Sequence, residues 1–124
     1  MIERHVAADH DEMVKMVALT LELNGFLQVK AELEGYPEPG RIVWRRNGEG
    51  FAPDVTADGG RLELFEVETD DSLYEPCTAD KLNLFSRFAR QHAAGFTVVV
   101  PRGWRAVAKK RLQNLGLDGA VWEM

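Results

Sequence analysis

The sequence predicts an α/β protein in which a mixed central sheet is flanked by helices. Apolar residues recur at helical spacing in three separate segments, and strand-like segments with Gly/Pro turns lie between them. FTVVVP (96–101) is almost continuously apolar, which is typical of a strand buried on both faces. The resulting order, α-β-β-β-α-β-α-β, favours a sheet with helices on both faces.

The first helix is predicted to begin at Asp9, because Asp9 and Glu12 have the spacing of a capping box. Asn24-Gly25 supplies the stop, and FLQVKAEL (26–33) has the composition of a strand. The apolar face of this helix consists of Val14, Val17, Ala18 and Leu21.

The middle of the chain is predicted to be short strands separated by turns. EGYPEPGR is a Pro/Gly turn region, IVWRR (42–46) is a short strand, and NGEG (47–50) is a second turn. The stretch FAPDVTADGGRLELFEVETDD (51–71) then forms a hairpin with Gly59-Gly60 at its tip.

The second half alternates helices and strands. Thr78 is predicted to cap the helix ADKLNLFSRFARQHAA, which Gly95 ends. After FTVVVP comes a third helix, stopped by Gly116, and GAVWEM is a last short strand. Without repeats or an internal linker, residues 1–124 are expected to form one domain.

Composition excludes several classes of protein. The 45% hydrophobic and 28% charged fractions are those of a globular protein, and no apolar run approaches the roughly 20 residues that span a bilayer. One cysteine, Cys77, excludes a disulfide framework and a cysteine-based zinc site. The charged N-terminus has no apolar region typical of a secretion signal, so a cytoplasmic location is expected.

Charge is unevenly distributed along the chain. Residues 1–80 hold 18 acids and 7 bases, or −11, and residues 81–124 hold 2 acids and 8 bases, or +6, which together give the net charge of −5. This division is consistent with an acidic cation-binding cluster beside a phosphate-binding surface. A chance division of surface charge would look the same.

Three carboxylates stand out in the predicted hairpin. Glu66 and Glu68 share one face of their strand because side chains alternate. A three-residue turn at Gly59-Gly60 would place Asp54 on that same face, whereas a two-residue turn would place it on the other. Three converging oxygen ligands suit Mg²⁺ or Mn²⁺. Alternatively, the glutamates are surface residues of an amphipathic strand and Asp54 caps a turn.

The string Pro53-Asp54, a hairpin, and Glu66-Val67-Glu68 resembles the motif of the PD-(D/E)xK nuclease superfamily, whose fold is restriction-endonuclease-like. The family's core order is similar to the order above, and ELNGFLQVKAE resembles the family's passage from helix one into strand one. The resemblance covers roughly residues 9–101. It implies a metal-dependent nuclease that hydrolyses phosphodiester bonds in DNA.

The resemblance also implies roles for individual residues. Asp54 and Glu66 would bind Mg²⁺ or Mn²⁺, and the Val67 carbonyl would add a ligand. Glu68 stands where the family usually has lysine; a minority of its restriction enzymes carry glutamate there, and Glu68 would bind metal or orient water. Other members move the lysine to the next helix, where Lys81 would stabilise charge. Lys81 as an ordinary exposed helix lysine is the alternative.

Members of the family often add an acid from helix one. Glu12 has a similar spacing but lies opposite the apolar face, whereas Asp11 and His10 flank that face. Which of the three joins the site stays open.

Basic residues suggest where nucleic acid would bind. Arg102, Arg105 and Lys109 fall on one side of the third helix, and Arg45-Arg46 precede the NGEG turn. Solvated helix and strand surfaces are the alternative, and Trp44, Trp104 and Trp122 are expected in the core. The expected partner is DNA rather than RNA, with a homodimer or a partner protein left open. A non-catalytic binding module of the same fold, or an unrelated α/β interaction domain, would share these features.

Overall fold

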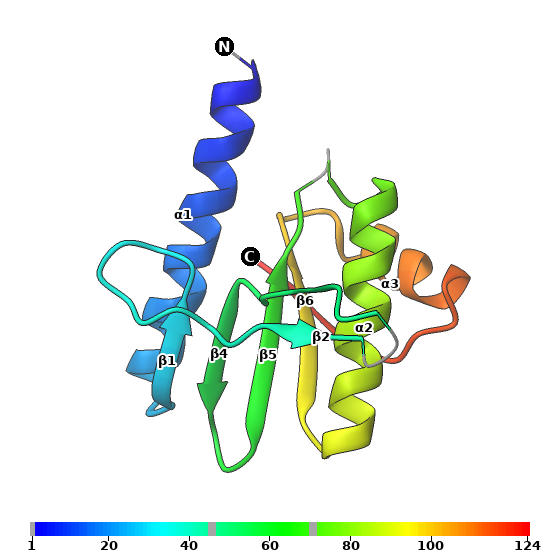
Figure 1. The fold of residues 1–124 in the computed structure, drawn as a ribbon. Helices are drawn as coiled ribbons and strands as arrows, with labels where there is room; N and C mark the ends of the chain where they lie inside the picture. The colour runs from blue at the N-terminus through cyan, green and yellow to red at the C-terminus, as the bar shows by residue number, and fades with distance from the viewer. Residues whose placement is uncertain (1, 45–46, 70–71) are drawn as a thin grey trace.

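The protein is an α/β structure in which helices cover both faces of a mixed five-stranded sheet (Figure 1). The structure, a computed structural model, describes residues 2–44, 47–69 and 72–124. Its elements are α1 (Ile2–Leu23), β1 (Leu27–Ala31), β2 (Ile42–Val43), β3 (Gly50–Phe51), β4 (Val55–Asp58), β5 (Leu62–Val67), α2 (Pro76–His92), β6 (Gly95–Val100), α3 (Arg105–Asn114) and β7 (Ala120–Glu123).

The main sheet has the strand order β1-β4-β5-β6-β7. The pairs β1–β4 and β4–β5 are antiparallel, and the pairs β5–β6 and β6–β7 are parallel. Strand β5 is therefore the junction between the antiparallel and the parallel half. The predicted mixed sheet with helices on both faces is confirmed at this level.

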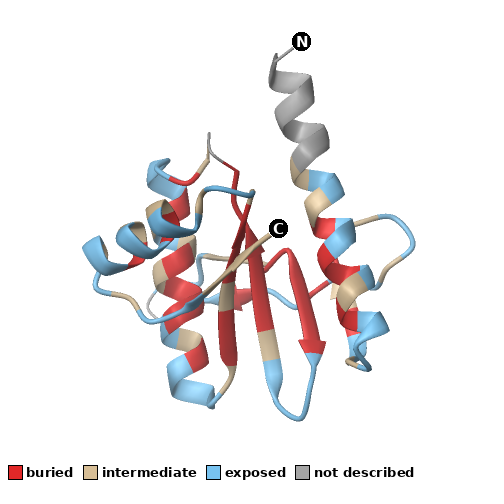
Figure 2. Cartoon of the chain, turned by 180° about the vertical axis from the view of Figure 1, so that it is seen from behind, coloured by how far each residue is buried: buried red, intermediate tan, exposed pale blue. Residues whose placement is uncertain are grey.

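Two hydrophobic clusters fill the space between the sheet and its helices. On one face, Val14 and Val17 of α1 belong to a cluster with Val99 of β6. On the other, Phe85 of α2 belongs to a cluster with Val98. Adjacent residues of β6 thus face opposite layers, which is why FTVVVP is apolar without interruption. In Figure 2 the buried residues, in red, lie on the strands of the main sheet and on parts of the helices.

The predicted helix starts are wrong in two places. Helix α1 begins at Ile2, so Asp9 lies inside the helix and does not cap it. Helix α2 begins at Pro76, whose fixed φ suits the first helical turn, and Thr78 is a buried residue inside the helix. It ends at His92 and is capped by Ala93, which has a left-handed φ of 53°, while Gly95 already belongs to β6.

The predicted order α-β-β-β-α-β-α-β is wrong between the first two helices, where the described residues form five strands and not three, and the expected strands are shortened. Strand β1 ends at Ala31, and the expected strand 42–46 is reduced to β2, Ile42–Val43. β2 pairs with β3 in a separate two-stranded sheet that packs on α2. Trp44 follows β2, and its backbone amide bonds the Glu49 carbonyl across the turn. Arg45 and Arg46 lie outside the described residues.

The β4–β5 hairpin has a three-residue loop, residues 59–61, because Asp58 pairs with Leu62. Gly60 has a φ of 104°, and its amide donates to the Asp58 carboxylate at 2.9 Å. Continuing this register by one step places Asp54 opposite Glu66. The three-residue turn, the condition for these two acids to share a face, is therefore confirmed.

In the described part of the chain, no helix is long and apolar enough to cross a membrane.

Gly60→Ala should lower the free energy of unfolding by about 1 kcal/mol, because an L-residue is strained at this positive φ. Gly40→Ala is the matched control, since Gly40 has ordinary φ and open space around its Cβ position. Urea unfolding in the presence of chelator measures both. Equal stability of the two variants would contradict the strained turn.

Candidate functional site

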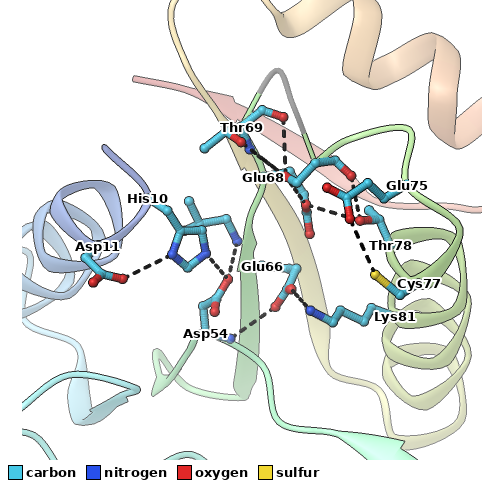
Figure 3. A network of polar contacts seen from close by, with 12 residues as sticks. His10, Asp11, Asp54, Glu66, Glu68, Thr69, Glu75, Cys77, Thr78 and Lys81 are labelled. Atoms are coloured by element: carbon cyan, nitrogen blue, oxygen red, sulfur yellow. Dashed lines mark hydrogen bonds and ion pairs between the residues drawn. The ribbon is translucent and has the colours of Figure 1, made fainter. Parts of the chain in front are cut away.

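The candidate site lies where β4 begins and β5 ends, between α1 and the first turns of α2 (Figure 3). Antiparallel pairing brings the start of β4 beside the end of β5. Helix α1 contributes His10, and α2 contributes Lys81. The site thus joins residues from four elements at one end of the sheet.

Asp54 and Glu66 are held together by two hydrogen bonds that involve the backbone. The Asp54 amide donates to Oε1 of Glu66 at 3.1 Å, and the Val67 amide donates to Oδ2 of Asp54 at 2.8 Å. Both acids are buried, with 7% of Asp54 and 2% of Glu66 exposed. The hairpin register therefore fixes both carboxylates from the main chain.

Glu66 is the most deeply buried of the acids. Burial raises the pKa of Glu66 well above its ordinary value, and the negative charges of Asp54 and Glu68 raise it further. Lys81 opposes this rise, with its Nζ 3.9 Å from Oε2 of Glu66. The ionised form of Glu66 is thus costly unless a cation compensates it.

Glu68 lies just beyond β5 and is 3% exposed. Its Oε1 accepts a hydrogen bond from the Ser72 hydroxyl at 2.6 Å, and the Thr78 hydroxyl oxygen lies 3.5 Å from the same atom. Burial raises the pKa of Glu68, while the Ser72 hydrogen bond opposes the rise. The Thr78 hydroxyl donates its single proton to the Ser72 carbonyl at 2.6 Å, so the start of α2 is linked to this carboxylate through Ser72.

His10 contacts Asp54 from α1, across the site from Lys81 (Figure 3). Its Nε2 is 3.4 Å from Oδ2 of Asp54, and its Nδ1 is 3.3 Å from the Asp11 carboxylate. The hydrogen bond to Asp54 raises the pKa of His10 from 6.5 to about 9, although burial opposes this. His10 is therefore an imidazolium at neutral pH in the metal-free protein.

Lys81 is placed against the acids and is not an ordinary exposed lysine. Its side chain is 33% exposed, and its Nζ lies 5.6 Å from the centre of the Phe51 ring. Burial lowers the pKa of Lys81, but attraction to Glu66, Glu68 and Asp54 outweighs that effect and the net pKa is raised. Lys81 therefore carries its positive charge into the site.

The carboxylates are oxygen donors of the kind that Mg²⁺ and Mn²⁺ prefer, but they do not form a finished metal site. Among the described side chains, those of residues 10–44, 47–69 and 72–124, no three His, Cys, Asp or Glu are grouped as a metal would need. Hydrogen bonds hold one oxygen each of Asp54, Glu66 and Glu68, and these bonds aim the carboxylates at protein donors. Rotation of these side chains would be needed to bring their oxygens onto one cation.

The predicted nucleic-acid-binding residues are not part of this cluster. Arg105 is paired with Glu123 at 3.7 Å and donates to the Val121 carbonyl. Arg102 and Lys109 are exposed on and beside α3. In the described portion, no hydrogen bond or ion pair joins Arg102, Arg105 or Lys109 to the three carboxylates of the candidate site. Arg45 and Arg46, the other two, are among the residues that the structure leaves undescribed.

Of the helix-one candidates, His10 reaches Asp54 directly, the Asp11 carboxylate contacts His10, and Glu12 is exposed. Helical spacing alone places His10 four residues before Val14, on the buried face of α1.

Sequence reasoning missed the hydroxyl partners of Glu68. Ser72 lies in a loop, and Thr78 has the residue type of a helix cap. Neither has a sequence signal that distinguishes a carboxylate partner from a turn residue.

Comparison with protein-family models, with curated proteins and with solved structures finds no match to this chain.

His10→Gln should remove a pH-dependent part of the stability in chelator. Since the folded pKa of His10 is raised to about 9, its contribution is complete below pH 6.5 and is lost as pH rises through 9. We expect wild type to exceed the variant by about 1–2 kcal/mol below pH 6.5, a modest figure because a third of His10 is exposed. Urea unfolding from pH 6 to 10 measures this, and a pH-independent difference would contradict the ion pair.

Replacing Glu68 should separate its charge from its hydrogen bonds. Glu68→Gln keeps an acceptor for the Ser72 hydroxyl and removes the carboxylate charge. Because the pKa of Glu68 is raised in the folded protein, its ionised form is destabilising. The free energy of unfolding of Glu68→Gln in chelator should therefore equal or exceed that of wild type, most clearly at high pH. Glu68→Lys removes the acceptor and should cost about 1–3 kcal/mol. Thermal and urea unfolding of the pair measure this. A lysine variant as stable as the glutamine variant would show that the Ser72 bond contributes nothing.

Proposed function

We propose that this protein is a metal-dependent nuclease that hydrolyses phosphodiester bonds in DNA. The supporting observation is the burial of Asp54, Glu66 and Glu68 at one end of the sheet, with His10 and Lys81 against them. The charges of Asp54 and Glu68 raise the pKa of buried Glu66, and burial raises the pKa of Glu68, so the ionised forms of these two glutamates reduce stability. Such clusters of perturbed carboxylates are typical of functional sites.

The donor set fits a divalent cation in kind. Asp54 and Glu66 would hold the ion together with the Val67 carbonyl, and Glu68 would bind the ion or orient water. A bound Mg²⁺ or Mn²⁺ supplies an electrophile that polarises a phosphodiester and activates water. Its charge would also compensate the buried acids.

The remaining residues have roles that follow from their own chemistry. Lys81, charged and beside Glu66, would stabilise negative charge on the phosphate during hydrolysis. His10 fixes Asp54 from α1 and balances its charge while no metal is present. The Val67 amide holds the same carboxylate oxygen from the other side. Hydrolysis itself adds water across a P–O bond.

A second candidate function is a nuclease-like binding module without catalysis. The specific observation in its favour is that Glu68 occupies the position of the usual lysine and is tied to Ser72 and Thr78. The carboxylates of the described residues also need rearrangement before they can share an ion. In that case the protein would bind nucleic acid or a protein and leave it intact.

Metal binding is the first test of the proposed nuclease. At a Mg²⁺ or Mn²⁺ concentration about 100 times Kd, binding to the folded state should raise the free energy of unfolding by about 2.7 kcal/mol. Asp54→Asn should abolish this gain, because an amide keeps the shape of the side chain and loses its charge. Asp118→Asn, an exposed acid outside the site, is the matched control and should keep the gain. No metal-dependent change in wild type would contradict the metal site.

Cleavage is the second readout of the same variants. Purified wild type with Mg²⁺ or Mn²⁺ should cleave at least one substrate among single-stranded, duplex and branched DNA, and Asp54→Asn should cleave none. Undiminished cleavage by Asp54→Asn would point to a contaminant or to another site. Failure of wild type to cleave any of these or RNA, together with no metal binding, would favour the binding module.

A further inference from the structure

The outer face of α2 carries a series of connected hollows that the carboxylate site does not use. One hollow of about 710 Å³ is lined by Arg41, Trp44, Arg87 and His92, among others. A second, of about 300 Å³, shares Trp44 and Arg87 with it. A third, of about 500 Å³, shares Arg41 and Trp44 and extends to Phe51. The shared residues make these hollows one continuous surface, which we call the α2 groove.

The α2 groove combines positive charge with an aromatic ring. The Arg87 guanidinium lies 5.8 Å from the centre of the Trp44 ring, and its Nε bonds Asn83 on the same helix. Arg41 and Arg87 are both exposed, and Arg41 donates to the Gly50 carbonyl. A guanidinium above an indole offers a charge for a phosphate and a flat surface for a base.

A second stacked pair lies at the far end of the groove. The rings of Phe88 and His92 are 4.2 Å apart with an interplanar angle of 29°, and both residues line the 710 Å³ hollow. His92 is exposed and Phe88 is partly buried. The groove therefore has two flat surfaces separated along the axis of α2.

The near end of the groove lies next to Lys81 of the carboxylate site. Phe51 lines the 500 Å³ hollow, and Lys81 lies over the ring of Phe51 while facing Glu66. From Lys81 to His92, α2 rises by about 17 Å, at 1.5 Å per residue. The acids at this end are Glu49 and Asp80, which line the same hollow. Phe51 is therefore the residue that the groove shares with the surroundings of Lys81.

We propose that the α2 groove binds the backbone and unstacked bases of single-stranded DNA and directs the strand to the carboxylates. The proposal rests on the proposed nuclease function and names the form of its substrate. Exposed Arg41 and Arg87 complement the phosphate charge, and the surfaces at Trp44 and His92 accept bases. Duplex DNA keeps its bases stacked and paired, so it would leave these flat surfaces unused.

Binding is tested in chelator, where cleavage cannot interfere and failure is distinguishable from failure of the metal site. Fluorescence anisotropy of an oligothymidylate of about ten nucleotides measures affinity. Arg87→Glu and Arg41→Glu should each weaken binding about tenfold and make it less dependent on salt, because each removes a phosphate contact. Trp44→Leu should weaken binding to a similar degree without changing the salt dependence, since it removes stacking only.

Lys15→Glu is the matched charge reversal. Lys15 is exposed on α1, which covers the opposite face of the sheet from α2. It should leave affinity unchanged to within about twofold. The arginine variants keep the test decisive if circular dichroism shows that Trp44→Leu does not fold.

Several outcomes would overturn the proposal. Equal losses in Lys15→Glu and Arg87→Glu would show that only net charge matters. Tighter binding of a duplex of the same length would exclude a single-strand groove, and tighter binding of oligouridylate would exclude DNA as its ligand. If the protein binds neither oligothymidylate nor the duplex nor oligouridylate, the α2 groove is excluded as a nucleic-acid surface, whatever the metal titration shows.

Discussion

The antiparallel register between β4 and β5 is the constraint on which the candidate site depends. In this register Asp54 lies opposite Glu66. The Glu66 carboxylate accepts a hydrogen bond from the Asp54 amide, and the Asp54 carboxylate accepts one from the Val67 amide. A slip by one residue would turn one acid to the other face of the sheet. The loop of residues 59–61, with Gly60 at positive φ, fixes that register at the far end of the hairpin.

The two helices complete an arrangement that the hairpin begins. Asp54 and Glu66 are placed by the sheet, but their charges are balanced by His10 from α1 and Lys81 from α2. These helices lie on opposite faces of the sheet, so the site forms at the end of the sheet where β4 begins and β5 ends, between the two helical layers. Burial strengthens each charge interaction and makes an uncompensated carboxylate costly. The α2 groove reaches Phe51, whose ring lies 5.6 Å from Nζ of the same lysine.

Patterns of alternation predicted much of this arrangement, whereas local signals at the helix starts gave wrong predictions. The parity of Glu66 and Glu68 and the three-residue turn led to the correct placement of Asp54, and the apolar run of β6 predicted its burial on both faces. The apparent caps at Asp9 and Thr78 failed. A capping residue acts within one turn, whereas Thr78 is held by tertiary contacts with the loop and Glu68. The groove rests on proximity between β2 and α2, which no local pattern specifies.

The position of β5 between an antiparallel and a parallel neighbour has a consequence for the order of folding. Its pairing with β4 closes a loop of three residues, whereas its pairing with β6 requires the whole of α2 to be inserted between the two strands. Local pairings cost less loop-closure entropy and form sooner. The two carboxylates thus meet while water still surrounds the hairpin and screens their repulsion. The desolvation cost arises only when the helices dock, in the same step that delivers the imidazole and the ammonium group.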